Sequence, residues 1–154
     1  MTTASDQHEP PYTLQLLTFV LADEVYGIPI LDVQEIRGRT DITPIPNSPP
    51  HIRGVMNLRG EIVPVLDLRA RIGLPPTDAS GVSIILRDGT RILGMSVDSV
   101  SDVVDVTEDS LSSVPDVHEV DETLLSGMAR CDDRLILLLN VQALVSNSLQ
   151  HTDA

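Results

Sequence analysis

Three carboxylates, Glu35, Glu61 and Asp67, could in principle converge in the fold and perform acid–base chemistry. Paired carboxylates perform such chemistry when their pKa values are separated and both reach one substrate. Each of them also fits a simpler role, as a hydrogen-bonded acid at the end of a strand. Asp67 and Asn140 follow similar apolar runs, which predicts that each caps the N-terminus of a helix. A small acid–base hydrolase is therefore the less favoured hypothesis, and it requires a strongly raised carboxylate pKa in a closed pocket.

The sequence shows no motif of a metal site, of a nucleophilic active site or of a phosphate-binding loop. The four histidines and the single cysteine, Cys131, show no paired spacing of the kind that metal sites use. The sequence lacks a Gly-x-Ser-x-Gly nucleophile motif and a glycine-rich phosphate loop. We therefore expect no enzymatic activity, no metal and no cofactor. A lone cysteine forms no disulfide within the chain, which suits a reducing compartment.

Composition and charge exclude further classes of function. The net charge of −13 and the pI near 4.4 argue against binding to a phosphate backbone, and only 2% of residues are aromatic and able to stack on bases. No apolar run approaches the length of a membrane-spanning helix. The sequence contains no lysine, so each basic side chain is an arginine. We expect a soluble cytoplasmic protein that binds no nucleic acid and inserts into no membrane.

The main architectural signal is an internal duplication. Residues 27–36 match residues 94–103 at an offset of 67, and residues 54–68 match residues 127–141 at an offset of 73. Each matched segment begins with a glycine and repeats the same apolar pattern. Two matches in the same order imply two similar small β-barrels packed together.

The elements that would build these barrels are mainly short strands. The pattern predicts strands or hairpins at 14–28, 55–67, 82–97, 100–106 and 125–139, a helical turn near 29–35, a short helix at 68–72 and a C-terminal helix to about 149. The pair Asp88 and Gly89 is typical of a type I′ turn. Residues 1–12 are expected to be a disordered tail, 107–122 an exposed acidic loop, and 75–81 the boundary between the two barrels.

Arg59 is the strongest candidate for an interaction residue. It lies at a glycine-containing turn, and Asp132 replaces it in the duplicate, so the fold does not demand an arginine there. An arginine presented by a rigid turn beside apolar surface is typical of an interface anchor. Glu35 could form an ion pair with it across the barrel.

Four apolar positions accompany Arg59 in the candidate site. They are Val33 and Ile36 in the duplicated segment of the first half and Val97 and Val100 in that of the second half, and Val100 lies at the repeat position of Val33. Each of them fits a core position. If the two barrels meet at these elements, some of the four side chains line a groove between them, and such a groove suits a helix or hairpin of a partner.

The sequence resembles the CheW chemotaxis coupling proteins. The similarity rests on residues 26–38, 45–49, 52–69 and 97–103 and extends from about residue 18 to 149. It implies a mainly β fold over 13–150, with two five-stranded SH3-like barrels around a shared hydrophobic centre, short helices and a C-terminal helix. The first barrel would span about 20–80 and the second about 81–140.

The resemblance also implies a function and partners. The chain would be a non-enzymatic adaptor between chemoreceptor cytoplasmic tips and the regulatory domain of the histidine kinase CheA, inside arrays where copies of it also touch each other. By position, Val33, Glu35, Ile36 and Arg59 would belong to the coupling surface, with Val97 and Val100 on the side of the second barrel. Coupling in a pilus-type or other alternative pathway stays open, as does a small-molecule sensor using the groove between the barrels.

Overall fold

The computed structural model describes residues 13–38, 42–75, 81–113 and 124–150, and the side chains up to residue 146. The expected tail at 1–12, and the expected acidic loop from residue 114 onwards, lie outside the described residues. The elements in chain order are β2 (Thr13–Leu21), β3 (Glu24–Pro29), η1 (Ile30–Asp32), β4 (Val33–Arg37), β5 (Ile52–Leu58), β6 (Glu61–Asp67), α2 (Leu68–Ile72), β7 (Val82–Asp88), β8 (Arg91–Val97), β9 (Ser99–Thr107), η2 (Glu108–Ser110), β10 (Leu111–Ser112), β11 (Leu125–Cys131), β12 (Arg134–Leu139) and α3 (Val141–Gln150).

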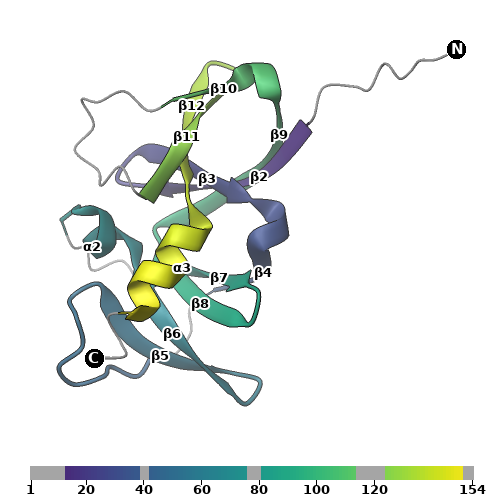
Figure 1. Cartoon of the computed structure of the whole chain (residues 1–154). Helices are drawn as coiled ribbons and strands as arrows, with labels where there is room; N and C mark the ends of the chain where they lie inside the picture. Colours follow the sequence, from purple (N-terminus) through teal and green to yellow (C-terminus); the bar gives the residue numbers. More distant parts are fainter. Residues whose placement is uncertain (1–12, 39–41, 76–80, 114–123, 151–154) are drawn as a thin grey trace, which may run out of the picture.

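Two sheets lie one above the other, with α3 packed beside the junction between them (Figure 1). The upper sheet has six strands in the order β10-β11-β12-β3-β2-β9, and the lower has five in the order β4-β7-β8-β6-β5. The sixth strand of the upper sheet, β10, has only two residues and begins inside the stretch that was expected to be a loop. The protein is mainly β, as the sequence predicted.

The strands of the two sequence halves are exchanged between the sheets. Strand β3 pairs in parallel with β12, and β8 pairs in parallel with β6, so each sheet joins strands from both halves. The lower sheet is built from the contiguous stretch 33–97, whereas the upper sheet combines residues 13–29 with residues 99–139, which differs from the expected division into barrels at about 20–80 and 81–140. The physical reason is that one residue, Asp98, separates β8 from β9, so the chain passes directly from the lower to the upper sheet.

The strand registers confirm the duplication. Gly27 lies opposite Leu138 in the upper sheet, and Gly94 lies opposite Val65 in the lower one. Gly94 is the repeat equivalent of Gly27 at the offset of 67, and Leu138 is the repeat equivalent of Val65 at the offset of 73. In each pair, one residue comes from the first repeat and the other from the second. The two sheets therefore repeat the same residue pairing.

Matching irregularities occur at Gly54 and Gly127. The register shifts between Ile52 and Gly54 in one hairpin and between Leu125 and Gly127 in the other. The φ angles of the two glycines are +149° and +159°, in a region that residues with a Cβ rarely adopt. A β-bulge at the same repeat position bends both hairpins alike.

One apolar cluster occupies the space between the sheets. It takes side chains from both sheets and from both helices, including Phe19, Tyr26, Met95, Leu137 and Leu144. Because the chain has no tryptophan and one phenylalanine, this cluster is built mainly from Leu, Ile, Val and Met, beside the aromatic rings of Phe19 and Tyr26. This cluster is the shared hydrophobic centre that the resemblance implied.

The helix ends follow the sequence signals, whereas one turn does not. Asp67 caps α2 by accepting hydrogen bonds from the main-chain nitrogens of Arg69 and Ala70, and the Asn140 side chain accepts one from Ala143. In the β7–β8 hairpin, Asp88 belongs to the strand and pairs with Arg91, so the turn residues are 89 and 90. Gly89 has a φ of +64° and Thr90 is not in the positive-φ region, which matches a type II′ turn and not the expected type I′.

Candidate functional site

Glu35 and Arg59 form the ion pair that the sequence suggested. The Arg59 guanidinium donates a hydrogen bond of 2.7 Å to Glu35 Oε1, across 24 residues of sequence. Glu35 lies on β4 at one edge of the lower sheet, and Arg59 lies in the β5–β6 turn at the other edge. Arg37 adds a longer contact of 3.4 Å to the second oxygen of Glu35. The pair therefore links the two edges of the lower sheet, as expected for a sheet that curls into a barrel.

The β5–β6 turn presents Arg59 to solvent in a defined direction. Arg59 has a φ of +52° and Gly60 one of +87°, and the Asn57 side chain accepts a hydrogen bond from the Gly60 nitrogen. The Arg59 side chain is 67% exposed although its guanidinium is bonded to Glu35. The matching turn of the upper sheet contains Asp132 and Asp133 at φ values of +50° and +69°. The same turn thus forms without an arginine, so the conformation of the turn does not require Arg59.

The charge state of Glu35 argues against the hydrolase hypothesis. Hydrogen bonding to Arg59 is the largest cause that lowers the pKa of Glu35 below its usual value, and Arg37 adds to it. A general acid needs the opposite shift. Asp67 is engaged in capping α2, and Glu61 is exposed. The three carboxylates have separate roles and form no acid–base pair.

The four apolar candidates divide by exposure. Ile36 is 44% exposed, whereas Val33 and Val100 are half-buried and pack against the central cluster from different sheets. Val97 is only 3% exposed and is part of that cluster. Its place in the core leaves it no surface to offer a partner. The five remaining candidates form the candidate coupling surface, called the coupling surface below: Val33, Glu35, Ile36, Arg59 and Val100.

Comparison with known proteins agrees with this architecture. Residues 15–149 match the family model described as the CheW-like domain. The chain belongs to the CheW-like family. It is 40% identical over 136 residues to a chemotaxis protein CheW of Klebsiella aerogenes, covering 86% of this chain and 82% of the relative. It is 35% identical over 137 residues to a probable chemotaxis protein CheW of Rhizobium etli, covering 87% and 88%.

A solved structure shows the same fold. The crystal structure of the scaffolding protein TtCheW from Thermoanaerobacter tengcongensis has a TM-score of 0.79 and 35% identity, covering 89% of this chain and 90% of that one. The two sheets of this CheW-like chain are thus the pair of SH3-like barrels that the resemblance implied. The family consists of scaffold proteins, which agrees with the expectation of a non-enzymatic role.

The upper barrel of this CheW-like chain has its own acid–arginine pair. Asp102 occupies the repeat position of Glu35, and its carboxylate lies 3.7 Å from the guanidinium of Arg134 on β12. Arg134 corresponds by offset to Glu61, so the arginine lies on the other side of the turn from Arg59. Sequence reasoning missed this pair. The matched positions of Glu35 and Asp102 were the available signal.

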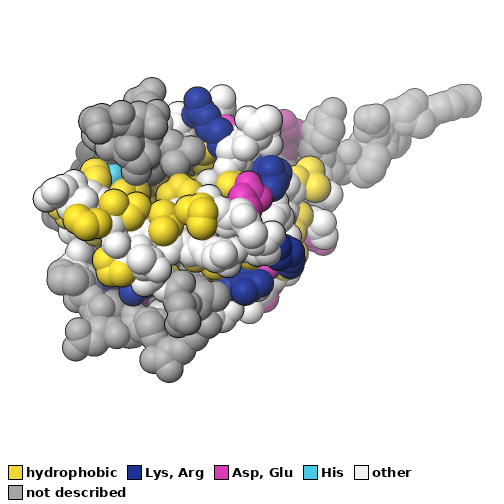
Figure 2. All heavy atoms as spheres, turned by 90° about the horizontal axis from the view of Figure 1, so that it is seen from below, with side chains coloured by type: hydrophobic (Ala, Val, Ile, Leu, Met, Phe, Trp, Pro, Cys, Tyr) yellow, Lys and Arg dark blue, Asp and Glu magenta, His cyan; other side chains and the backbone are white. Residues whose placement is uncertain are grey.

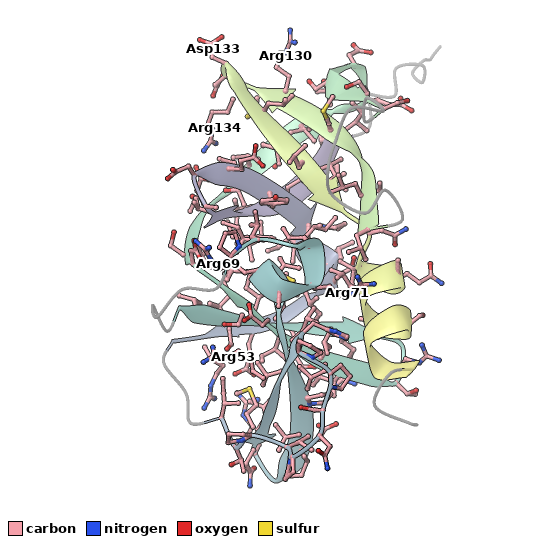
Figure 3. The ribbon with its side chains drawn as sticks, turned by 90° about the vertical axis from the view of Figure 1, so that its left-hand side faces the viewer. Arg53, Arg69, Arg71, Arg130, Asp133 and Arg134 are labelled. Atoms are coloured by element: carbon pink, nitrogen blue, oxygen red, sulfur yellow. The ribbon has the colours of Figure 1, made fainter. Side chains whose placement is uncertain are left out.

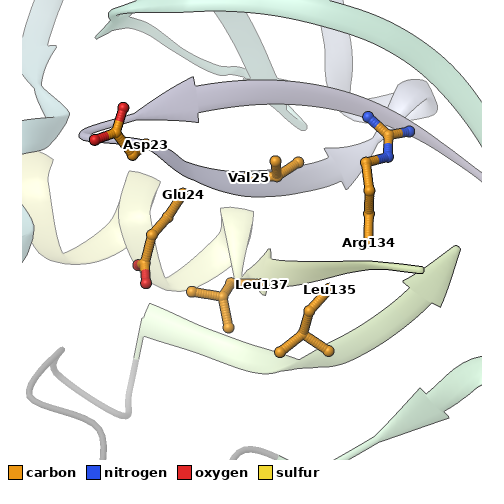
Figure 4. A pocket seen from close by; sticks show the side chains of 6 residues that line it. All are labelled: Asp23, Glu24, Val25, Arg134, Leu135 and Leu137. Carbon is orange, nitrogen blue, oxygen red and sulfur yellow. The ribbon is translucent and has the colours of Figure 1, made fainter. Parts of the chain in front are cut away.

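Two cavities lie on the upper barrel and away from the coupling surface. One of about 250 Å³ is lined by Asp23, Glu24, Val25, Arg134, Leu135 and Leu137, with the carboxylates toward one end and Arg134 toward the other (Figure 4). A second of about 370 Å³ lies between η2, β10 and β11 and shares Leu135 with the first. No residue of the coupling surface lines either cavity. The hypothesis of a small-molecule sensor between the barrels gains no support from them.

The outer face of the lower barrel carries exposed apolar side chains. Figure 2 shows hydrophobic side chains gathered on the side of the molecule where β5 and β6 lie in Figure 1. Ile62 and Ile45 are exposed, and Val55 and Pro64 are half-buried neighbours in the β5–β6 register. The alternation of β6, with Val63 and Val65 buried, was the signal that Ile62 points outward.

The described residues include neither a candidate metal site nor a candidate membrane-spanning helix. Within them, no group of three or more His, Cys, Asp or Glu side chains is arranged to hold a metal ion. No helix in the same part of the chain is long and apolar enough to cross a membrane.

Proposed function

We propose that this CheW-like chain is an adaptor that couples the cytoplasmic tips of chemoreceptors to the regulatory domain of the histidine kinase CheA. Membership of the CheW-like family supports a coupling role in chemotaxis, and the names of its relatives point the same way. The proposal places the chain in the cytoplasm, near the membrane through its receptors. Within such an array, contacts between copies of the chain are also expected.

Arg59 carries the proposal at the level of residues. Its side chain is oriented by Glu35 and remains two-thirds exposed, and its guanidinium has five N–H donors, so donors are left for a partner. Arginine is enriched at the centres of interfaces because it combines directed donors with a flat, weakly hydrated surface. Ile36 and the half-buried Val33 supply apolar area beside it. A receptor helix with an acidic side chain next to an apolar one would suit this surface.

An adaptor of this kind works through two simultaneous contacts. Each contact can be weak, because an array holds the second partner close once the first is bound. The two-barrel architecture offers such a chain two pseudo-equivalent surfaces, since the strand pairing of one sheet is repeated in the other. We propose that the coupling surface binds the receptor, and that Glu35 and Arg59 also take part in binding the kinase.

Binding measurements with purified fragments test the proposal. The wild type should bind both a chemoreceptor cytoplasmic fragment and the CheA regulatory domain, and Arg59→Ala should weaken receptor binding about tenfold or more. Asp132→Ala, at the matching turn of the other barrel, is the control and should leave receptor binding unchanged. Binding of the wild type to neither partner would remove the proposed function. Equal receptor binding by wild type and Arg59→Ala would remove the role of Arg59.

The choice of fragments also addresses the alternative pathways. Receptor fragments from a flagellar system and from a pilus-type system can be compared against the same protein. The fragment bound more tightly at physiological salt identifies the pathway that the chain serves.

A further inference from the structure

Arg69 and Asp98 form an ion pair that joins the two barrels. The Arg69 guanidinium donates from Nε to Asp98 Oδ1 at 2.9 Å and from Nη2 to Asp98 Oδ2 at 2.8 Å. Arg69 lies on α2, which follows strand β6 of the lower sheet, and Asp98 is the residue at which the chain crosses to the upper sheet. The two side chains are only 16% and 26% exposed. Figure 3 shows Arg69 at the level between the two sheets.

The same carboxylate also holds a turn of the upper barrel. The main-chain nitrogen of Ala22, in the β2–β3 turn, donates a hydrogen bond of 3.0 Å to Asp98 Oδ2. Arg69 in turn donates to the carbonyl oxygen of Pro75, at the end of the lower barrel's helix segment. One pair of side chains thus ties α2, the crossover and the β2–β3 turn together. We refer to Arg69, Asp98 and the Ala22 nitrogen as the clamp.

The clamp constrains the relative orientation of the barrels, which the apolar core does not do. Hydrophobic packing between the sheets is favourable but has no preferred direction. A bidentate arginine–carboxylate pair fixes both distance and orientation. The clamp therefore restricts rotation of one barrel against the other.

The other crossover between the sheets lacks such a clamp. By the repeat offsets, Asp98 corresponds to Leu31 in η1, and Arg69 corresponds to Gln142 in α3. Leu31 is 93% exposed and Gln142 is also exposed. The fold makes this second crossover without an ion pair at the equivalent position. The clamp is consequently an addition to the fold at one side of the junction.

The coupling surface depends on how the barrels are oriented. Val33, Glu35, Ile36 and Arg59 belong to the lower barrel, whereas Val100 belongs to β9 of the upper barrel, two residues after Asp98. A partner that touches both sides senses any rotation between them. We propose that Arg69 and Asp98 are positioning residues that hold the barrels in the orientation at which the coupling surface is complete. This inference rests on the proposed function for its effect on binding, and not for its effect on orientation.

A distance measurement between the barrels tests the orientation directly. The native Cys131 is replaced by serine, and spin labels are placed on Thr90→Cys in the lower barrel and Asp105→Cys in the upper barrel, both exposed positions. The wild-type background should give one narrow distance distribution. Asp98→Asn and Arg69→Ala should broaden or shift it, and Arg69→Lys, which retains one ionic contact, should fall between them and the wild type.

A matched control separates this effect from the general loss of a charge pair. Arg134→Ala removes the Asp102–Arg134 pair, which lies within the upper barrel. It should leave the distance distribution unchanged. An unchanged distribution in both Asp98→Asn and Arg69→Ala, with each variant folded by its NMR amide spectrum, would overturn the inference.

Binding of the receptor fragment supplies the second readout on the same variants. Asp98→Asn should weaken receptor binding about fivefold, a size typical of indirect coupling, and Arg69→Lys should weaken it less. Weaker binding without any change of distance would also overturn the inference, because the residues would then contact the partner directly. If the wild type bound no partner, the proposed function would fail while the distance measurement still decided whether the clamp orients the barrels.

Discussion

Replacing Gly54 by alanine should destabilise the protein far more than the same change at Gly127. An added Cβ at Gly54 would lie well inside the contact distance of the Thr43 carbonyl oxygen, and within 2.9 Å of the Cα of Pro44. Thr43 and Val55 exchange two main-chain hydrogen bonds, of 2.8 and 2.9 Å, at this point. The substitution must therefore displace the segment that holds Thr43 against β5.

The expected magnitude follows from these contacts. Forcing a residue with a Cβ into this backbone region costs about 1–3 kcal/mol. Loss of the two hydrogen bonds to Thr43 adds about 1 kcal/mol each. The sum is about 4 kcal/mol, which lowers the melting temperature of a chain of this size by roughly 10 °C.

Gly127 should respond more mildly although its φ angle is similar. Its added Cβ would meet the Ser112 carbonyl oxygen at 2.9 Å, and Ser112 belongs to the two-residue edge strand β10, which can shift. We expect only the backbone strain, about 1–2 kcal/mol.

Urea unfolding followed by circular dichroism measures both differences. Gly38→Ala is the control, because nothing lies within 4 Å of its added Cβ, and its free energy of unfolding should stay within about 1 kcal/mol of the wild type. The reasoning is refuted if Gly54→Ala also stays within that range, or if Gly127→Ala costs more than Gly54→Ala.

Three further predictions test separate features. Hydrogen bonding to Arg69 lowers the pKa of Asp98 in the folded protein. The ionised carboxylate therefore stabilises the fold at pH values above its pKa in the unfolded chain, which is about 4. This stabilisation is lost as the pH falls through the lower pKa of the folded state. The free energies of unfolding of wild type and Asp98→Asn should differ by about 1–2 kcal/mol from pH 8 to 5 and converge below about pH 4; an equal gap at all pH values would count against this. Val97→Ala should lower the free energy of unfolding by about 2 kcal/mol, because Val97 lies in the core. Val33→Ala should lower it less and should reduce receptor binding. Scanning calorimetry measures the stability of both variants, and titration calorimetry measures their receptor binding. Asp67→Ala should cost about 1 kcal/mol through loss of the α2 cap, and an unchanged urea midpoint would contradict it.

The duplication was readable from the sequence because its signals are local. Glycines at fixed offsets mark the bulges, and the apolar runs that follow them carry the strand pattern. Asp67 and Asn140 at matched positions predicted both helix caps. The Glu35–Arg59 pair was suggested because Glu35 comes at the end of the predicted helical turn and could reach Arg59 across the barrel.

The exchange of strands between the sheets has no local signal. Parallel pairing of β3 with β12 and of β8 with β6 depends on which hydrophobic faces meet, and each half carries an equivalent pattern. The buried position of Val97 follows from that exchange, because β8 lies in the middle of its sheet. A sequence with two equivalent halves does not reveal which hairpin pairs with which.

The clamp is a second feature that could not be predicted from the sequence. Arg69 and Asp98 are 29 residues apart and belong to different parts of the duplicated pattern. Arg69 follows a predicted helix cap and Asp98 follows a predicted strand, so each has a plausible surface position when considered alone. Only the three-dimensional crossing of the chain at Asp98 brings them together.

Formation of a ternary complex tests the adaptor role most directly. Receptor fragment, CheA regulatory domain and this chain are mixed and examined by sedimentation velocity, each alone, in pairs and together. We predict one species containing all three components with the wild type, and loss of the receptor from it with Arg59→Ala. Failure of the wild type to join both partners in one species would contradict the proposed coupling function.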